Sequence, residues 1–268
     1  MKFFSTNTAS TNTASTNTAS TNRAAPARDR ILAQARFETV TLLRNGEQLL
    51  VALVLPAMAL VGLVLSHSPS LGPGRRVDLA VPGVLALAVI STAFTGQAIS
   101  TAFDRRYGVL RLLGVSPLGR NGLLVAKALA VLTIELLQGV VIGGLGLALG
   151  WHPQWMGLFA GGLLALVGTW MFVALAVLLA GTLRAEGVLA LANLIWVTLL
   201  GLGGVIIPRT QMPSGLSHVA ALLPSGALGD GLREAFMHGR LAGIPLLVLV
   251  VWGAVATALA SRTFRWSD

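Results

Sequence analysis

Glu135 is the one acidic side chain well inside a long apolar stretch of this sequence, in VLTIELLQGV, and Gln138 follows it one helical turn later. A carboxyl group near the middle of a bilayer costs about 2.5 to 3.5 kcal/mol on insertion scales, so it should face other helices or water. Two interpretations stay open. Glu135 could be a proton-linked or cation-recognising group in a translocation path, or a protonated or hydrogen-bonded packing contact.

A second group of polar side chains lies between residues 91 and 101, again within an apolar stretch. The group consists of Ser91, Thr92, Thr95, Gln97, Ser100 and Thr101. At about 100° per residue the first three share one side of an α-helix and the last three the opposite side, so they form no continuous polar stripe. They could line a path, or they could make hydroxyl contacts between helices. The residues that we assign to a substrate path are Thr92, Thr95, Gln97, Thr101, Glu135, Asn193 and Trp196.

The residue types that carry enzymatic chemistry are sparse. The chain has no cysteine and only two lysines, and Lys127 is flanked by alanines, so no phosphate-binding loop with a G-x-x-x-x-G-K-[ST] pattern is present. The aspartates form no close acidic pair for Mg²⁺, and Ser214 and Ser225 stand in PSG rather than G-x-S-x-G contexts. We therefore expect no catalytic residue and no cofactor bound by this chain.

The four histidines are the remaining metal-ligand candidates. They are His67, His152, His218 and His238. None stands at a metal-ligand spacing from another, so we interpret them as ordinary loop and interface residues and predict no metal site.

The composition indicates a membrane protein. Hydrophobic residues make up 54% of the 268 residues and charged residues 11%, against about 25% charged residues in soluble domains. The formal charge of +9 would suggest nucleic-acid binding in a soluble protein. In a membrane protein, basic residues instead gather on the cytoplasmic side, so we expect no nucleic-acid partner.

The chain divides into a tail and one membrane domain. Residues 1–27 hold STNTA repeats with almost nothing to bury, which predicts a disordered low-complexity tail. Residues 28–268 form one six-span membrane domain, in which 29–48 suits an amphipathic helix at the membrane interface. The six predicted spans are about 49–66, 80–103, 123–149, 156–181, 187–207 and 242–261. The fold class is thus an all-α membrane protein with six transmembrane helices.

The distribution of basic residues predicts the orientation. With the amino terminus inside, fourteen of the 19 lysines and arginines lie on the inner side. This fits the positive-inside tendency, so we expect a multi-pass protein of the cell membrane with both termini cytoplasmic. Before the last span, residues 208–240 contain two apolar segments too short to cross, which predicts re-entrant or interfacial helices on the outer face.

The loop after the second span, YGVLRLLGVSPLGR, predicts a short amphipathic cytoplasmic helix. Tyr107, Leu110 and Leu113 recur every three residues, and Gly114 with Pro117 ends the helix. Such a helix could anchor the loop in the interface, or it could insert its apolar face into a groove of a cytoplasmic partner.

Several stretches of the sequence resemble the permease subunits of type 2 ABC exporters, a class that includes antibiotic-resistance, lipid and polysaccharide exporters. They are FDRRYGVLRLLGVSPLGRNGLLVAK, LLRNGEQLLVALVLPAMAL, LLPSGALGDGLREAF and the terminal RTFRW. The resemblance covers about Arg28 to Trp266, and its most specific part is Y-G-x-L-R-x-L-G-x-[ST]-P. The polar repeat of residues 5–24 has no counterpart in that pattern.

The resemblance implies a coupling helix after the second span, outer re-entrant helices, and a dimer of identical or different permeases. It also implies a separate ATP-binding cassette ATPase subunit that binds ATP and Mg²⁺. It assigns Tyr107, Gly108, Arg111, Leu112, Gly114 and Pro117 to the coupling element, and the apolar pattern adds Leu110 and Leu113.

The implied function is the export of a small amphipathic drug or lipid, along a route between the two permeases that involves the second and fifth spans. Membrane lipid is then a further partner. The alternative is an ATP-independent membrane protein, either a scaffold or a proton-coupled carrier that uses Glu135.

Overall fold

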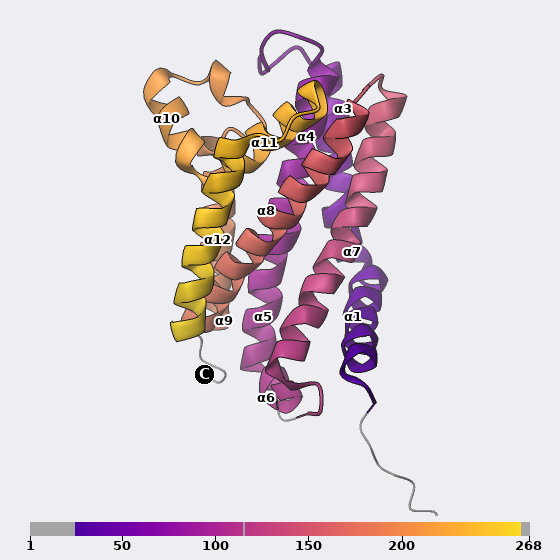
Figure 1. Ribbon diagram of the computed structural model, residues 1–268, viewed down its shortest axis with the longest axis vertical. Helices are drawn as coiled ribbons and strands as arrows, with labels where there is room; N and C mark the ends of the chain where they lie inside the picture. The colour runs from indigo at the N-terminus through magenta and orange to yellow at the C-terminus, as the bar shows by residue number, and fades with distance from the viewer. Residues whose placement is uncertain (1–24, 115, 264–268) are drawn as a thin grey trace, which may run out of the picture.

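The computed structural model describes residues 25–114 and 116–263 of the chain, and within these ranges it contains helices and loops but no strand. The long helices lie side by side in one bundle (Figure 1). The predicted all-α class is confirmed. The predicted tail falls outside the described residues up to position 24, as does the chain beyond Thr263.

The first half of the described chain forms four long helical stretches, two of which contain a π-helical turn, and one short helix. In order they are α1 (Ala27–Arg44), α2 (Gly46–Leu49), the π-helical turn η1 (Leu50–Val54), α3 (Leu55–Leu65), α4 (Arg76–Val89), the π-helical turn η2 (Ile90–Gly96), α5 (Gln97–Arg106), α6 (Val109–Gly114) and α7 (Gly119–Ala148). The second half consists of α8 (Trp155–Thr182), α9 (Ala185–Leu202), the 3-10 turn η3 (Arg209–Gln211), α10 (Ser214–Leu222), α11 (Pro224–His238) and α12 (Gly243–Thr263).

Among the described residues, five helices are long and apolar enough to cross a membrane, and one apolar helix is shorter. The five are Arg76–Arg106, Gly122–Ala148, Trp155–Thr182, Ala185–Leu202 and Gly243–Thr263, and the shorter one is Leu50–Leu65. Helices therefore lie at all six predicted ranges, but only the second to the sixth are long and apolar enough to cross a membrane. The fifth differs most, because α9 ends at Leu202 rather than near residue 207.

The ends of the bundle carry different elements. α6 lies at one end, together with the start of α1 and the last turn of α12, whereas α10 and α11 lie at the other (Figure 1). We call these the α6 end and the α11 end. α1 packs along the first half of α7. Its predicted location at the membrane interface and the re-entrant nature of α10 and α11 stay predictions.

A buried arginine explains why α9 stops early. The guanidinium of Arg233 in α11 donates hydrogen bonds to the carbonyl oxygens of Gly204 at 2.9 Å and of Val205, which therefore need no helical donor. Gly204 adopts φ +69°, a conformation that favours glycine. Burial lowers the pKa of Arg233 to about 10, although the carboxylate of Asp230 opposes this shift. The arginine thus stays charged at neutral pH.

A glycine face of α8 lets α11 and α12 pack closely. A Cβ atom on Gly157 would overlap the carbonyl oxygen of Ala235, and one on Gly161 would lie 2.6 Å from the ring of Phe236. These two glycines form a GxxxG pattern, which in membrane proteins permits close backbone approach. Gly253 of α12 makes the same kind of contact with Trp170.

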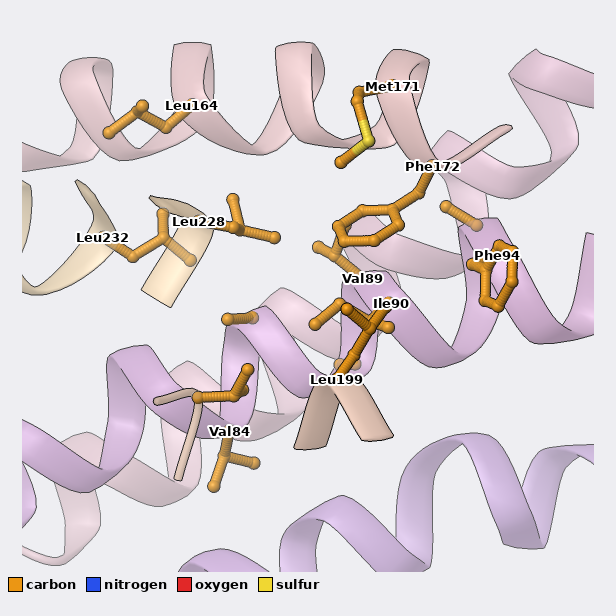
Figure 2. Packing of buried hydrophobic residues seen from close by; sticks show 14 of the residues in the cluster. Val84, Val89, Ile90, Phe94, Leu164, Met171, Phe172, Leu199, Leu228 and Leu232 are labelled. Atoms are coloured by element: carbon orange, nitrogen blue, oxygen red, sulfur yellow. The ribbon is translucent and has the colours of Figure 1, made fainter. Parts of the chain in front are cut away.

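The core lies where α4, η2, α8, α9 and α11 meet. An aromatic contact in this core joins Phe94 of η2 to Phe172 of α8, with ring centroids 6.4 Å apart. Figure 2 shows these rings beside Met171 and Ile90, with Leu228 of α11 further along α8. The second span is the most deeply buried of the five, so it is held from all sides.

Candidate functional site

Three consecutive charged residues end α5, just before α6, and each one binds a different helix. The guanidinium of Arg105 donates to the carbonyl of Ala180 at 2.6 Å and to that of Leu183, both at the end of α8. Arg106 pairs with Glu186 in the first turn of α9. Arg105 is 5% exposed, so its bonds to free carbonyls at a helix terminus form away from water.

The third charged residue, Asp104, belongs to a buried ion cluster. The ammonium of Lys127 in α7 lies 2.6 Å from a carboxylate oxygen of Asp104 and 3.3 Å from one of Glu38 in α1. Lys127 is 5% exposed, while Glu38 also accepts a hydrogen bond of 3.0 Å from Gln34. The sequence DRR therefore connects α5 to α1, α7, α8 and α9.

The predicted coupling residues divide between an exposed and a buried set. Tyr107 and Leu112 are 70% and 71% exposed at the α6 end, and Pro117 is also exposed. Leu110 is only 2% exposed, because this short helix turns that side toward α5 and α7. The structure does not describe the side chains of Arg111 and Leu113 or the burial of Gly114.

Backbone and ring geometry hold Tyr107 in place. Gly108, the next residue, has φ +74°, which lets the chain turn sharply between α5 and α6. The Tyr107 ring stacks on Phe103 with centroids 6.0 Å apart, and the guanidinium of Arg106 lies 6.0 Å from its centroid. The exposed ring is thus fixed relative to α5.

A pocket of about 760 Å³ opens between the first, second, third and fifth spans. Its apolar walls come from residues such as Leu49, Leu55, Leu87, Val131 and Ile134. The polar and charged residues that line it are Glu38, Asn45, Ser91, Thr92, Thr95, Gln97, Ser100, Lys127, Asn193 and Trp196. Its volume is in the range of small-molecule sites, about 300 to 1,000 Å³.

The π-helical turns η1 and η2 both line this pocket. A π-helical turn bonds residue i to residue i+5 and therefore rotates the following residues relative to an α-helix. The sequence predicted two separate polar groups on opposite sides of the second span, and this prediction was wrong. The same pocket is lined by both groups, Ser91, Thr92 and Thr95 from one and Gln97 and Ser100 from the other, because η2 changes the helical rotation between them.

Five of the seven residues predicted for a substrate path line the pocket, and two do not. Thr92, Thr95, Gln97, Asn193 and Trp196 are brought together there. Thr101 is 3% exposed and lies outside the lining, and so does Glu135.

Sequence reasoning missed Glu38, Asn45 and Lys127 as lining residues. Of these three residues, only Lys127 could have been recognised from the sequence, because a single lysine inside a predicted span requires an acidic partner.

The comparison with protein families decides the identity. The model for the ABC-2 family transporter proteins matches residues 73–262. The chain belongs to this family. In a comparison with curated proteins, no sequence matched. The chain is thus a type 2 ABC permease, the membrane component of a transporter, and the matched range contains the α5–α6 junction and most of the pocket-lining helices.

Glu135 of this ABC-2 permease lies between α7 and α8. Its Oε2 atom lies 2.5 Å from the hydroxyl oxygen of Thr169, and that hydroxyl also lies 2.8 Å from the carbonyl oxygen of Ala165. The Thr169 hydroxyl is the donor to the carboxyl group of Glu135. This geometry fits a packing contact between two helices.

Among the described residues, no three His, Asp or Glu side chains come together as metal ligands. Charged groups at this site act through ion pairs and hydrogen bonds, and the pocket presents apolar walls with a polar lining.

Proposed function

We propose that this ABC-2 permease exports a small amphipathic drug or lipid, driven by ATP hydrolysis on a separate cytoplasmic ATPase subunit. α6 is the coupling helix, ATP and Mg²⁺ bind the ATPase, and this chain performs no catalysis. The α6 end, with both termini, faces the cytoplasm of the cell.

The connection between α6 and the rest of the bundle carries this proposal. Tyr107 and Leu112 are exposed at the end of the molecule, whereas the charged residues just before Tyr107 bind α7, α8 and α9 and reach α1 through Lys127. Since packed helices move as rigid bodies, a force on α6 reaches the spans around the pocket directly. An interfacial anchor would need no such connection.

A second permease, identical or different, completes the path. α9 exposes Asn193 and Thr198 beside Leu194 and Val197, and the first two are polar. Polar side chains on a membrane helix commonly face another helix rather than lipid. Because Asn193 also lines the pocket, a partner on this face would close the pocket from that side.

The test is co-purification from native membranes. The double variant Tyr107→Asp with Leu112→Asp places two charges on the exposed surface of α6 and should abolish copurification of an ATP-binding cassette ATPase, identified by mass spectrometry, while the permease still inserts. The matched control is Leu222→Asp in α10, an equally exposed leucine at the α11 end, 69% exposed. It should leave the association unchanged.

Unchanged association of the double variant would reject the docking role of α6. Transport by the purified permease without any ATPase would reject the whole proposal.

A further inference from the structure

We propose that the pocket between α1, η1, η2, α7 and α9 binds an amphipathic organic cation, such as a lipophilic amine. This names the substrate class of the exporter and therefore rests on the proposed function. Three independent features of the pocket carry it: its charge, its unpaired polar groups, and its apolar wall.

An ion cluster of Glu38, Lys127 and Asp104 lies at the α6-side end of the pocket and carries a net formal charge of −1, with Asp104 just outside the lining. Glu38 and Lys127 are the two charged residues in the lining, and Lys127 is already shared with Asp104. Two carboxylates around one ammonium leave a formal charge of −1. Lys127 lies closer to Asp104, at 2.6 Å, than to Glu38, at 3.3 Å, so Glu38 is the carboxylate that is less fully neutralised. A cation entering here gains a partner, whereas an anion meets surplus negative charge.

Two polar side chains in the lining lack partners. Gln97 is 8% exposed, and no described residue makes a hydrogen bond with its amide. The hydroxyl oxygen of Thr95 is also buried without a partner among the described residues. Buried polar groups are nearly always hydrogen-bonded, so the Thr95 hydroxyl indicates a missing partner, and the Gln97 amide keeps its donors and its acceptor for a bound molecule. The Gln97 carbonyl and the Thr95 hydroxyl can both accept a hydrogen bond from a protonated amine.

The rest of the lining suits the hydrophobic part of such a molecule. Leu55, Leu87 and Val131 form apolar walls, and Trp196 is the aromatic residue in the lining. The indole N–H of Trp196 is engaged with Ser91 at 2.9 Å, which fixes the ring. Indole faces attract organic cations more strongly than phenyl rings do. A neutral lipid would use the walls but not the charged end.

Equilibrium dialysis of the purified full chain in phosphatidylcholine nanodiscs tests this inference, with empty nanodiscs subtracted. The probes are tetraphenylphosphonium and tetraphenylborate, which have the same shape and opposite charge. We expect saturable binding of the phosphonium and none of the borate. Glu38→Gln should weaken phosphonium binding about tenfold, because a charged partner is replaced by a neutral one.

The matched control is Asp29→Asn, the same kind of change at an exposed acid of α1 outside the pocket, which should leave binding unchanged. Glu38 also holds Lys127, so a second variant leaves the ion cluster intact. Gln97→Leu keeps all charges and should weaken binding of a protonated lipophilic amine, propranolol, several-fold, but should leave phosphonium binding nearly unchanged because tetraphenylphosphonium has no N–H to donate.

Three outcomes would overturn the inference: equal binding of both ions, preference for the borate, or wild-type phosphonium affinity in Glu38→Gln together with wild-type propranolol affinity in Gln97→Leu. Binding requires neither ATPase nor transport, so these outcomes leave the exporter proposal standing. Conversely, transport by the purified permease without any ATPase would reject the exporter proposal without touching the measured binding.

Discussion

The side-chain amide of Gln138 in α7 donates a hydrogen bond of 2.9 Å to the backbone carbonyl of Ala52, in the middle of the π-helical turn η1. The same amide lies 3.0 Å from the hydroxyl oxygen of Thr92 in the other π-helical turn, η2. Gln138 is 1% exposed. One buried residue of the third span therefore joins the irregular turns of the first two spans, beside the pocket.

Replacing Gln138 by leucine should destabilise the protein. The carbonyl of Ala52 and the hydroxyl of Thr92 would lose their common partner inside the membrane domain. Hydrogen bonds between membrane helices contribute about 0.6 kcal/mol on average and up to about 1.7, and we expect the upper part of this range because two bonds disappear. Reversible unfolding in mixed micelles, followed by tryptophan fluorescence, measures the change.

The control for that experiment is Thr133→Val on the same helix, whose hydroxyl bonds only the carbonyl of Leu129 on the exposed face. It should change the free energy of unfolding by less than about 0.5 kcal/mol. Equal effects of the two substitutions would show that Gln138 does not hold the π-helical turns.

The ion cluster at the α6 end predicts strong coupling between Lys127 and Asp104. Lys127→Met leaves two carboxylates without their cation and should cost about 2 kcal/mol, less than for a fully buried pair because both acids are a fifth to a quarter exposed. Asp104→Asn in the Lys127→Met background should recover part of that loss. A double-mutant cycle on thermal unfolding measures the coupling.

A surface pair provides the comparison for that cycle. Arg240 lies 3.6 Å from Glu234 and is 73% exposed, so Arg240→Met should cost less than about 1 kcal/mol. Additive effects of the Lys127 and Asp104 substitutions would contradict a shared cluster.

The positions of the apolar helices and of α6 could be predicted from the sequence alone, whereas the pocket could not. Apolar runs identify membrane helices because every backbone group in lipid must bond within its own helix. Gly108 and Pro117 set the limits of α6 through local backbone geometry. In contrast, Glu38 and Lys127 are 89 residues apart and meet only through the packing of α1 on α7.

Two further features depended on tertiary structure. The π-helical turn η2 brings Gln97 and Ser100 to the same pocket as the polar residues before them. No local pattern of residues 90–96 predicts this π-helical turn. The early end of α9 depends on Arg233, which reaches the carbonyl of Gly204 from 29 residues further along the chain.

Glu135→Gln tests whether the acid inside the third span takes part in transport. Since its carboxyl group pairs with Thr169 and does not line the pocket, the neutral amide should keep the contact and leave transport intact. We expect ATP-driven uptake of tetraphenylphosphonium by inside-out vesicles containing the complete complex to show the same pH profile as the unsubstituted protein. Loss of uptake, or of its pH dependence, would favour the proton-coupled carrier instead.

Two glycines of α8 that are five residues apart, Gly157 and Gly162, should respond in opposite ways to the same substitution. Gly157→Ala adds a Cβ atom where the backbone of α11 already lies, against the carbonyl of Ala235. Neither backbone can yield without moving a whole helix, so we expect a loss at the upper end of the usual 1 to 3 kcal/mol for overpacking. Gly162→Ala meets nothing within 4 Å and should be neutral or stabilise by about 0.5 to 1 kcal/mol through helix propensity. Thermal unfolding in detergent compares the two variants, with the folded fraction measured by size-exclusion chromatography. If the unfolding midpoints of Gly157→Ala and Gly162→Ala are equal, α11 does not pack on this face of α8 in the membrane.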